Sequence, residues 1–193
     1  MKQETRGNVC VFCASSANID PRYLQAAREL GELLARGGWR SINGGGAVGL
    51  MGAVTDGALD AGGQVTGVIP KFMVDKGWCY DRLADVIITA DMHQRKQTMS
   101  DMADAVIALP GGVGTLEELL ETLTWRQLGL VKVPIIILNT MGYYDALLAM
   151  LQHAIDEGFM KPSHNQLWCV ADTPQDAITL LENNKPVEFE SKY

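Results

Sequence analysis

The chain has 193 residues, of which 16 are Lys or Arg and 23 are Asp or Glu, so its formal net charge is −7. This length makes one domain the default, and the acidic balance without a cluster of Lys or Arg argues against nucleic acid as a partner. Apolar residues occur only in short runs and residues 1–7 lack a leader pattern, so we expect no membrane partner and a soluble, cytoplasmic protein.

The first predicted strand, 9–13, is followed by Ala14-Ser15-Ser16. Small hydroxyl residues at this place suit a turn that faces a ligand, and they suit a solvated turn equally well. Asp20-Pro21 then supplies an N-cap and a first-turn proline for a helix that Gly37-Gly38 ends. The residues that this helix presents on one face are Tyr23, Ala27, Leu30 and Leu34.

Four cysteines, at positions 10, 13, 79 and 169, are too few and too scattered for a disulfide scaffold, so reduced thiols are expected. Cys10-x-x-Cys13 has a spacing found in redox and metal sites. Both residues lie in an apolar strand, however, where alternation places their side chains on opposite faces. We interpret both as core or near-site residues and expect no metal site.

The second predicted strand, 39–43, runs into a glycine-rich turn that extends from Gly44 to Gly52 and includes Gly45 and Gly46. A glycine-rich turn between a strand and a helix is weak evidence for a nucleotide site, because tight packing also requires small residues. The helix that follows is predicted over 48–61.

A third strand is predicted over 65–69 and is closed by Pro70. The stretch 71–80 is expected to be irregular. Its aromatic residues, Trp78 and Tyr80, are candidates either for a pocket wall or for plain surface packing.

After a fourth strand at 86–88, Asp91 caps a helix and Gln94 completes a capping box. His93 in this polar helix start more often caps or packs than catalyses. Arg95-Lys96 could be surface charge, but the helix macrodipole disfavours cations at an N-terminus. An anionic partner nearby would explain the pair, and we favour that functional interpretation.

The most informative stretch is an apolar run, 105–109, that leads through a proline into a glycine turn. The uniformly apolar run predicts a buried parallel strand. Gly111, Gly112 and Gly114 can take positive φ and allow a ligand close to the backbone. Thr115 then opens a helix whose free N–H groups point back at that ligand, so the turn favours phosphate.

Glu118 has two explanations. Thr115-x-x-Glu118 is a capping box, in which each side chain satisfies a backbone donor of the other residue, and capping is enough to explain this glutamate in isolation. A carboxylate beside a phosphate-attracting turn also repels the ligand, however, and catalysis would be a reason for placing it there.

The last part of the chain continues the alternation. Gly129 ends the helix after the glycine turn, Gly158 ends the next helix, and Thr173-Pro174-x-Asp176 caps a final one. The strands between them are predicted over 134–139 and 167–171, and the inward helix positions are Tyr144, Leu147, Leu148, Leu151, Ile155, Ala177, Ile178 and Leu181.

Apolar strands that alternate with helices imply a single α/β domain, a doubly wound parallel sheet with helices on both faces. In such sheets ligands bind at the carboxyl edge, near the point where the strand order reverses. Ser15, the turn at 44–46, the helix start at Arg95 and the turn at 111–115 each follow a strand, so they share this edge. The convergence predicts a pocket the size of a mononucleotide.

Three motifs of the chain belong together: Pro110-Gly-Gly-Val-Gly-Thr-Leu-Glu-Glu118, Asp91-Met-His-Gln-Arg-Lys96 and Gly44-Gly-Gly-Ala-Val-Gly-Leu-Met-Gly52. With them the chain resembles, over residues 8–182, the LONELY GUY family of cytokinin-activating phosphoribohydrolases, often labelled lysine decarboxylase-like. This likeness implies a Rossmann-like nucleotide-binding domain, with flexible termini at 1–7 and 183–193. It also implies a homodimer without cofactor that hydrolyses the N-glycosidic bond of AMP or N6-substituted, cytokinin-type nucleoside 5'-monophosphates to free base and ribose 5-phosphate.

By motif, Arg95 and Glu118 match the catalytic pair of that family. Glycosidic cleavage passes through a cationic ribosyl centre, which a carboxylate can stabilise while it activates water. Arg95 could bind an anionic substrate oxygen or assist departure of the base. The substrate-contacting candidates are Lys96, Gly111, Gly112, Gly114, Thr115, Glu117 and Thr124, together with Gly45, Gly46 and Ser15 from the other turns.

The chain departs from plant members of the family at Ala14, Asn43 and Val113, and it reads Asp75-Lys76-Gly77-Trp78 in a segment where they carry an acidic residue. These departures bear on the base more than on catalysis, so we expect strict recognition of the 5'-phosphate and loose recognition of the base. The alternative function is a non-catalytic carrier of a nucleotide or of the molybdenum cofactor, which needs the glycine turns but not the catalytic pair. A lysine decarboxylase is not favoured, because no lysine lies in a cofactor-linking context.

Overall fold

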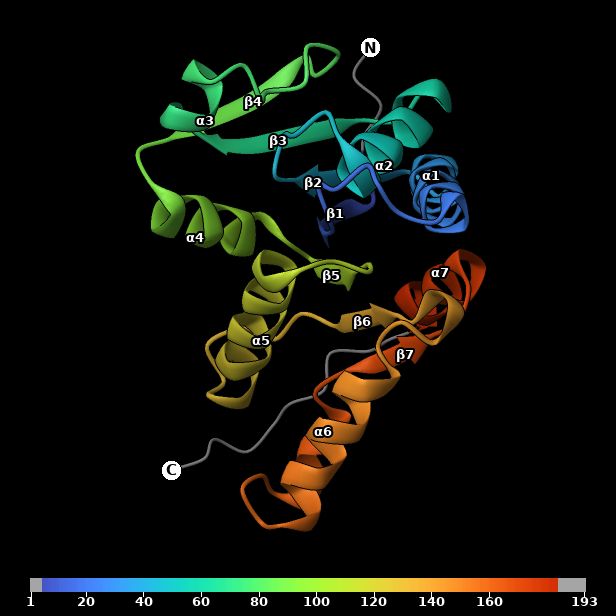
Figure 1. The fold of residues 1–193 in the computed structure, drawn as a ribbon, viewed down its shortest axis with the longest axis vertical. Coiled ribbons are helices and arrows are strands. Elements are labelled where there is room, and N and C mark those ends of the chain that lie inside the picture. The colour runs from blue at the N-terminus through green and yellow to red at the C-terminus, as the bar shows by residue number, and fades with distance from the viewer. Residues whose placement is uncertain (1–4, 184–193) are drawn as a thin grey trace.

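The computed structural model describes residues 5–183, in which seven parallel strands form one sheet in the order β4-β3-β2-β1-β5-β6-β7 (Figure 1). The predicted α/β fold is therefore confirmed. The strands are β1 (Gly7–Phe12), β2 (Trp39–Asn43), β3 (Val65–Pro70), β4 (Asp85–Thr89), β5 (Ala105–Ala108), β6 (Ile135–Leu138) and β7 (Cys169–Ala171). The α-helices are α1 (Pro21–Arg36), α2 (Gly49–Asp60), α3 (Lys71–Asp75), α4 (Met92–Met102), α5 (Val113–Gln127), α6 (Asp145–Asp156) and α7 (Pro174–Asn183).

The ends predicted to be flexible, 1–7 and 183–193, lie mostly outside the described residues. Within the described part, Gly7 begins β1 and Asn183 ends α7, and Arg6 forms an ion pair with Glu182 at 2.8 Å. Among the helices of residues 5–183, none is long and apolar enough to cross a membrane.

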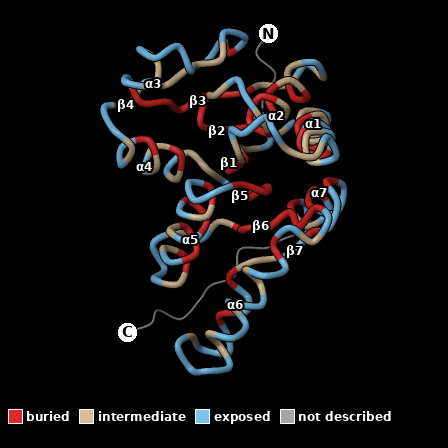
Figure 2. Tube along the Cα trace, viewed as in Figure 1, coloured by how far each residue is buried: buried red, intermediate tan, exposed pale blue. Residues whose placement is uncertain are grey.

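Helices cover both faces of the sheet (Figure 1). On one face α1, α2 and α7 pack over a core layer that includes Val9 and Ile107. On the other face α4 and α5 pack over a layer that includes Cys10 and Ile137. The middle strands are accordingly buried, whereas the outer faces of the helices are exposed (Figure 2). Cys10 and Cys13 belong to different core layers, as strand alternation predicted.

Three predicted helix starts are confirmed. Asp20 accepts a hydrogen bond from the second helical N–H of α1. At the start of α4, Asp91 accepts from the N–H of Gln94 at 2.8 Å, and before α7 Thr173 accepts from the N–H of Asp176 at 3.2 Å. Each bond satisfies a backbone donor that the first turn of a helix leaves without a partner.

The start of α5 differs from the prediction. The helix begins at Val113 with Gly112 as its N-cap, and no side chain of the described residues caps it. Thr115 instead packs over Gly111, where an added Cβ would lie 2.2 Å from Oγ1 of Thr115. Because α5 begins before Thr115 and without a side-chain cap, the predicted capping box is wrong, and capping does not explain Glu118.

The periphery of the fold also differs from the prediction. Residues 71–80 are not irregular throughout, because they include α3. The edge strand β4 is only partly covered, with Ile88 55% exposed, since no strand of the described sheet pairs beyond it. Of the predicted inward positions, Tyr144 just before α6 is buried, whereas those within α6 are only partly buried, because this helix extends past the sheet (Figure 1).

The strand order reverses between β1 and β5. From β1 the sheet continues through β2, β3 and β4 in one direction, whereas β5, β6 and β7 lie in the other. The connections after β1 and β5 therefore leave toward opposite faces and open a crevice at the carboxyl ends of these strands.

Candidate active site

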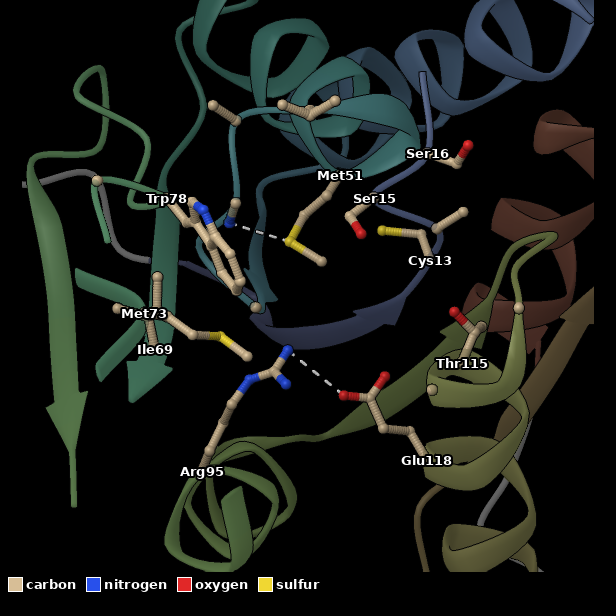
Figure 3. A pocket seen from close by; sticks show the side chains of 18 residues that line it. Cys13, Ser15, Ser16, Met51, Ile69, Met73, Trp78, Arg95, Thr115 and Glu118 are labelled. Atoms are coloured by element: carbon tan, nitrogen blue, oxygen red, sulfur yellow. Dashed lines mark hydrogen bonds and ion pairs between the residues drawn. The ribbon is translucent and has the colours of Figure 1, made fainter. Parts of the chain in front are cut away.

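A cavity of about 620 Å³ lies at this crevice. Ligand pockets typically measure about 300–1,000 Å³, so the cavity has room for a mononucleotide. The segments that follow β1, β2, β3 and β5 line it together with α4, which is the convergence that the sequence predicted (Figure 3). The predicted site residues in its lining are Ser15, Gly46, Arg95, Gly112, Gly114, Thr115 and Glu118.

Arg95 reaches the cavity from α4 with a side chain that is only 8% exposed. Its Nε donates a hydrogen bond to the carbonyl oxygen of Val68 at 3.1 Å, which fixes the guanidinium at the end of β3. The guanidinium also lies against Gly44, where an added Cβ would be 2.0 Å from Nη2. Gly44 therefore leaves the space that the guanidinium of Arg95 occupies, a reason that the sequence did not reveal.

Glu118 faces Arg95 from α5, with 3.4 Å between Oε1 and Nη2 (Figure 3). This separation exceeds the usual N–H···O distance, so the two groups attract each other while both keep hydrogen-bonding capacity for a ligand. Burial raises the pKa of Glu118, and the positive charge of Arg95 opposes that shift. A buried carboxylate of this kind in a cleft is typical of catalytic acids and bases.

The glycine turn before α5 presents backbone rather than side chains to the cavity. Contrary to the prediction, none of Gly111, Gly112 and Gly114 takes positive φ. Their smallness matters for space instead, because a Cβ on Gly112 or Gly114 would meet no atom of the described chain within 4 Å. A ligand can therefore contact the backbone there.

The two helices whose N-cap residues line the cavity, α2 at Val48 and α5 at Gly112, lack side-chain caps in the described structure. By contrast, Asp20 and Asp91 cap α1 and α4 with their carboxylates. Free N–H groups and the positive end of the helix dipole favour an anion. The uncapped starts of α2 and α5 thus make this cavity suitable for a phosphate group.

Backbone hydrogen bonds fasten the turns around the cavity to one another. Ala14 N–H donates to the carbonyl oxygen of Pro110 at 3.2 Å, and the carbonyl oxygen of Ala14 accepts from Met51 N–H at 3.2 Å. Gly49 approaches Ser16 so closely that a Cβ would lie 2.5 Å from its carbonyl oxygen. The turns after β1, β2 and β5 therefore form one connected rim.

The wall opposite Thr115 and Glu118 is apolar (Figure 3). Trp78 belongs to this wall. Its segment is held against the glycine turn after β2 by the Gly46–Cys79 bridge and by a hydrogen bond from Tyr80 N–H to the carbonyl oxygen of Gly45 at 2.9 Å. The sequence proposed Trp78 for a pocket wall but gave no signal for its neighbours, because they come from separate elements. These neighbours are Val48, Met51, Ile69 and Met73.

Several predicted site residues lie outside the cavity lining. Lys96 forms ion pairs with Glu117 and with Glu121, the latter at 2.9 Å. Thr124 is exposed and donates its hydroxyl to the carbonyl oxygen of Leu120. Gly45 and Gly111 also do not line the cavity. Gly45 has φ +72°, and Gly111 packs against Thr115.

Two departures from the plant proteins also lie away from the cavity. Asn43 is fully buried and holds the turn after β2, since its Oδ1 accepts from Gly45 N–H and its Nδ2 donates to Thr55. Val113 is 84% exposed and outside the lining. Within residues 5–183 no group of three His, Cys, Asp or Glu side chains is placed to hold a metal ion.

Comparisons with known proteins point to one family. The family described as possible lysine decarboxylase matches residues 51–181. Two cytokinin riboside 5'-monophosphate phosphoribohydrolases of Arabidopsis thaliana are each 44% identical to this chain, one covering 93% of it and 78% of the relative, the other 94% and 83%. Among solved structures, the molybdenum cofactor binding protein from the phototrophic bacterium Rippkaea orientalis has a TM-score of 0.70 at 26% identity, covering 93% of this chain and 98% of that one.

Proposed function

We propose, from the premise that this chain belongs to the LONELY GUY family of phosphoribohydrolases, that it hydrolyses the N-glycosidic bond of cytokinin-type nucleoside 5'-monophosphates to free base and ribose 5-phosphate. AMP is included among its substrates. The observation that carries the proposal is the buried Arg95–Glu118 pair beside the uncapped N-terminus of α5. In this proposal the start of α5 binds the phosphate, and the Arg95–Glu118 pair acts on the sugar and the base.

The 5'-phosphate binds to the backbone N–H groups at the start of α5. These groups lie in a partly enclosed cavity, where the helix dipole adds to each hydrogen bond. Thr115, buried and 4% exposed, adds a hydroxyl to the same wall. With the phosphate fixed there, the ribose extends toward Glu118.

Glu118 acts on the anomeric carbon of the ribose. As the C1'–N bond breaks, its electron pair passes to the base nitrogen and positive charge develops on the ribosyl ring. The carboxylate stabilises that charge and accepts a proton from the water whose oxygen bonds to C1'. A glutamate held free of any capping bond is available for both tasks.

Arg95 stabilises negative charge in the same reaction. Its Nε donates to the carbonyl oxygen of Val68 and its Nη1 contacts the sulfur of Met92 at 3.7 Å, whereas Nη2 is directed toward Glu118 across the cavity (Figure 3). The guanidinium therefore binds a substrate oxygen or the departing base while it holds Glu118 ionised. Both roles depend on the fixed position that Val68 and Gly44 impose.

The base occupies the apolar wall. Met51, Ile69, Met73 and Trp78 offer ring and thioether contacts but no side-chain amide or hydroxyl to read the base edge. Stacking is tolerant of base identity, since every base has a π-face. Recognition of the base is therefore loose, while recognition of the phosphate is strict.

Chromatographic measurement of free base from five compounds tests this function. AMP and N6-isopentenyladenine riboside 5'-monophosphate should be hydrolysed, whereas adenosine, ATP and lysine should remain intact. Adenosine lacks the phosphate that the uncapped N–H groups require, and a triphosphate brings extra negative charge near Glu118. Turnover of adenosine at the AMP rate would contradict the phosphate argument.

A carrier of a nucleotide or of the molybdenum cofactor is the second candidate, because the Rippkaea orientalis protein shares the fold. The greater identity to the plant hydrolases and the presence of both Arg95 and Glu118 favour the enzyme. The same assay separates the two, since a carrier would release base from neither monophosphate.

We further propose that the protein is a homodimer whose contact includes α4 and α5. Apolar side chains remain uncovered along α5 and just after it, with Leu128 39% and Leu130 70% exposed. Burial of such residues against a second copy is favourable. Light scattering at micromolar concentration should give twice the chain mass, and a monomer would contradict the proposal.

A further inference from the structure

Tyr143 contacts the glycine turn before α5, residues 111–114, from outside the cavity. It lies between β6 and α6, and its Oη donates a hydrogen bond to the carbonyl oxygen of Gly111 at 2.7 Å. Tyr143 does not line the cavity, whereas the next residue of the turn, Gly112, does. The phenol is thus placed to hold the turn rather than to contact a ligand.

Because the peptide unit is planar, this contact also fixes the direction of the Gly112 N–H. In a planar trans peptide, the carbonyl of Gly111 and the N–H of Gly112 point in opposite directions. A carbonyl held toward Tyr143 therefore directs the following N–H away from Tyr143. Without the phenol, the glycine pair can rotate this peptide at little cost, because neither residue has a side chain to oppose the rotation.

The position of the Tyr143 ring is itself well determined. The ring makes edge contacts with Tyr23 of α1, with centroids 5.9 Å apart, and with Tyr144, with centroids 5.1 Å apart. The neighbouring Tyr144 N–H donates to Oδ1 of Asn139 at 2.7 Å. Met141 in the same turn has φ 58°, a left-handed conformation that is costly for a side-chain residue and that this network maintains.

We propose that Tyr143 is a positioning residue for the 5'-phosphate, which keeps the Gly111–Gly112 peptide turned so that its N–H donates to the ligand. This inference rests on the proposed function, because it assumes that the phosphate binds at the start of α5. Tyr143 acts through the backbone of Gly112 and does not touch the substrate. Its removal should weaken binding of phosphorylated ligands without removing the chemistry of Glu118.

The test compares Tyr143→Phe with Tyr144→Phe. Both substitutions delete a single hydroxyl from adjacent residues of one turn. Tyr144 is 1% exposed and its Oη donates to the carbonyl oxygen of Leu109 at 2.6 Å, so its loss should lower the melting temperature. Tyr143 is 42% exposed, so its loss should leave the melting temperature almost unchanged. Calorimetric titration with ribose 5-phosphate, and the KM and kcat for AMP, are measured for both variants.

Tyr143→Phe should raise the Kd for ribose 5-phosphate and the KM for AMP about three- to tenfold, the size expected for one hydrogen bond, with little change in kcat. Tyr144→Phe should leave both constants near the wild-type values. Wild-type affinity in Tyr143→Phe, or equal weakening in both variants, would overturn the proposal. If the wild type binds ribose 5-phosphate but releases no base from AMP, the hydrolase proposal fails while the role of Tyr143 can still be measured.

Discussion

Adjacent residues of α4 pair with α5 in two different ways: Arg95 pairs with Glu118, and Lys96 pairs with Glu117 and Glu121. The inner pair, Arg95 with Glu118, has side chains 8% and 10% exposed and faces the cavity. The outer pair joins the adjacent residues, Lys96 and Glu117, and Glu121 adds a second carboxylate. The Glu117 side chain is 49% exposed and that of Lys96 12%, so this cluster reaches the surface at its carboxylate end.

A motif match does not distinguish residues that face the cavity from their neighbours in sequence that lie outside it. Consecutive helix residues project about 100° apart, so neighbours in sequence face different environments. Lys96 has its charge partners within the protein, whereas the inner pair is 3.4 Å apart and keeps unused hydrogen-bonding capacity. The resemblance predicted substrate contacts for Lys96 and Glu117, and the structure places both outside the cavity lining. Variants can test whether function follows this division.

The largest expected effect is that of Glu118→Gln, compared with Glu117→Gln as the matched control. Loss of the inner carboxylate should lower kcat for AMP about 10³-fold, because stabilisation of the ribosyl cation and activation of water are both lost. Ribose 5-phosphate should still bind. The same change at Glu117 should alter kcat less than about threefold, since this half-exposed carboxylate lies outside the cavity lining and Lys96 keeps Glu121 as a partner. Similar losses in the two variants would remove the distinction between inner and outer pairs.

The next effect is that of Arg95→Ala, which should lower kcat/KM for AMP about 10²-fold through lost stabilisation of developing negative charge. Arg95→Lys should recover only part of the activity, because the single nitrogen of an ammonium cannot both bond to Val68 and face Glu118 as the guanidinium does. The control is Lys96→Ala. A Lys96→Ala variant as inactive as Arg95→Ala would show that the outer pair belongs to the site.

A smaller effect should appear in the pH dependence of kcat/KM. Burial raises the pKa of Glu118, Arg95 lowers it, and among the outer charges Glu117 raises it while Lys96 lowers it. Activity of an ionised Glu118 is lost as pH falls through this pKa. Glu117→Gln should therefore move the acid limb to lower pH, and Lys96→Met should move it to higher pH. Identical profiles for wild type and both variants would show that Glu118 does not control the limb.

The smallest effect concerns stability. The folded pKa of Glu118 lies above its unfolded value, so the folded state binds the proton more tightly. Relative to Glu118→Gln, wild-type stability should thus be greatest below the ordinary glutamate pKa of about 4.3 and should fall as pH rises through the raised pKa. Urea unfolding of both proteins across this range measures the difference. A difference that grows with pH would mean that Arg95 outweighs burial.

Local chemistry made much of the fold predictable. The continuous apolar runs of β5 and β6 identified these strands, because strands buried on both faces need apolar side chains throughout. Asp20, Asp91 and Thr173 marked three helix starts, because capping depends on residues next to one another in the chain. The shared edge of the turns followed from parallel topology alone.

The sequence alone did not explain why individual site residues occupy their positions. Thr115 and Glu118 fit a capping box, yet α5 starts earlier, at Val113, and Thr115 packs against Gly111 instead. Gly44 is explained by the guanidinium of Arg95, which lies 51 positions further along the chain. No local pattern can show a contact between elements so far apart.

The sequence by itself determined the parallel α/β fold, the edge of the sheet at which the site lies and the acidic and basic groups available there. Only the tertiary structure decided that Arg95 and Glu118 face each other in the cavity while Lys96 and Glu117 pair outside it. It also decided which apolar residues form the wall and that Tyr143 donates a hydrogen bond to the glycine turn before α5. Helix rotation, close packing on glycine and contacts between distant elements set these features, and each is a property of how the elements meet.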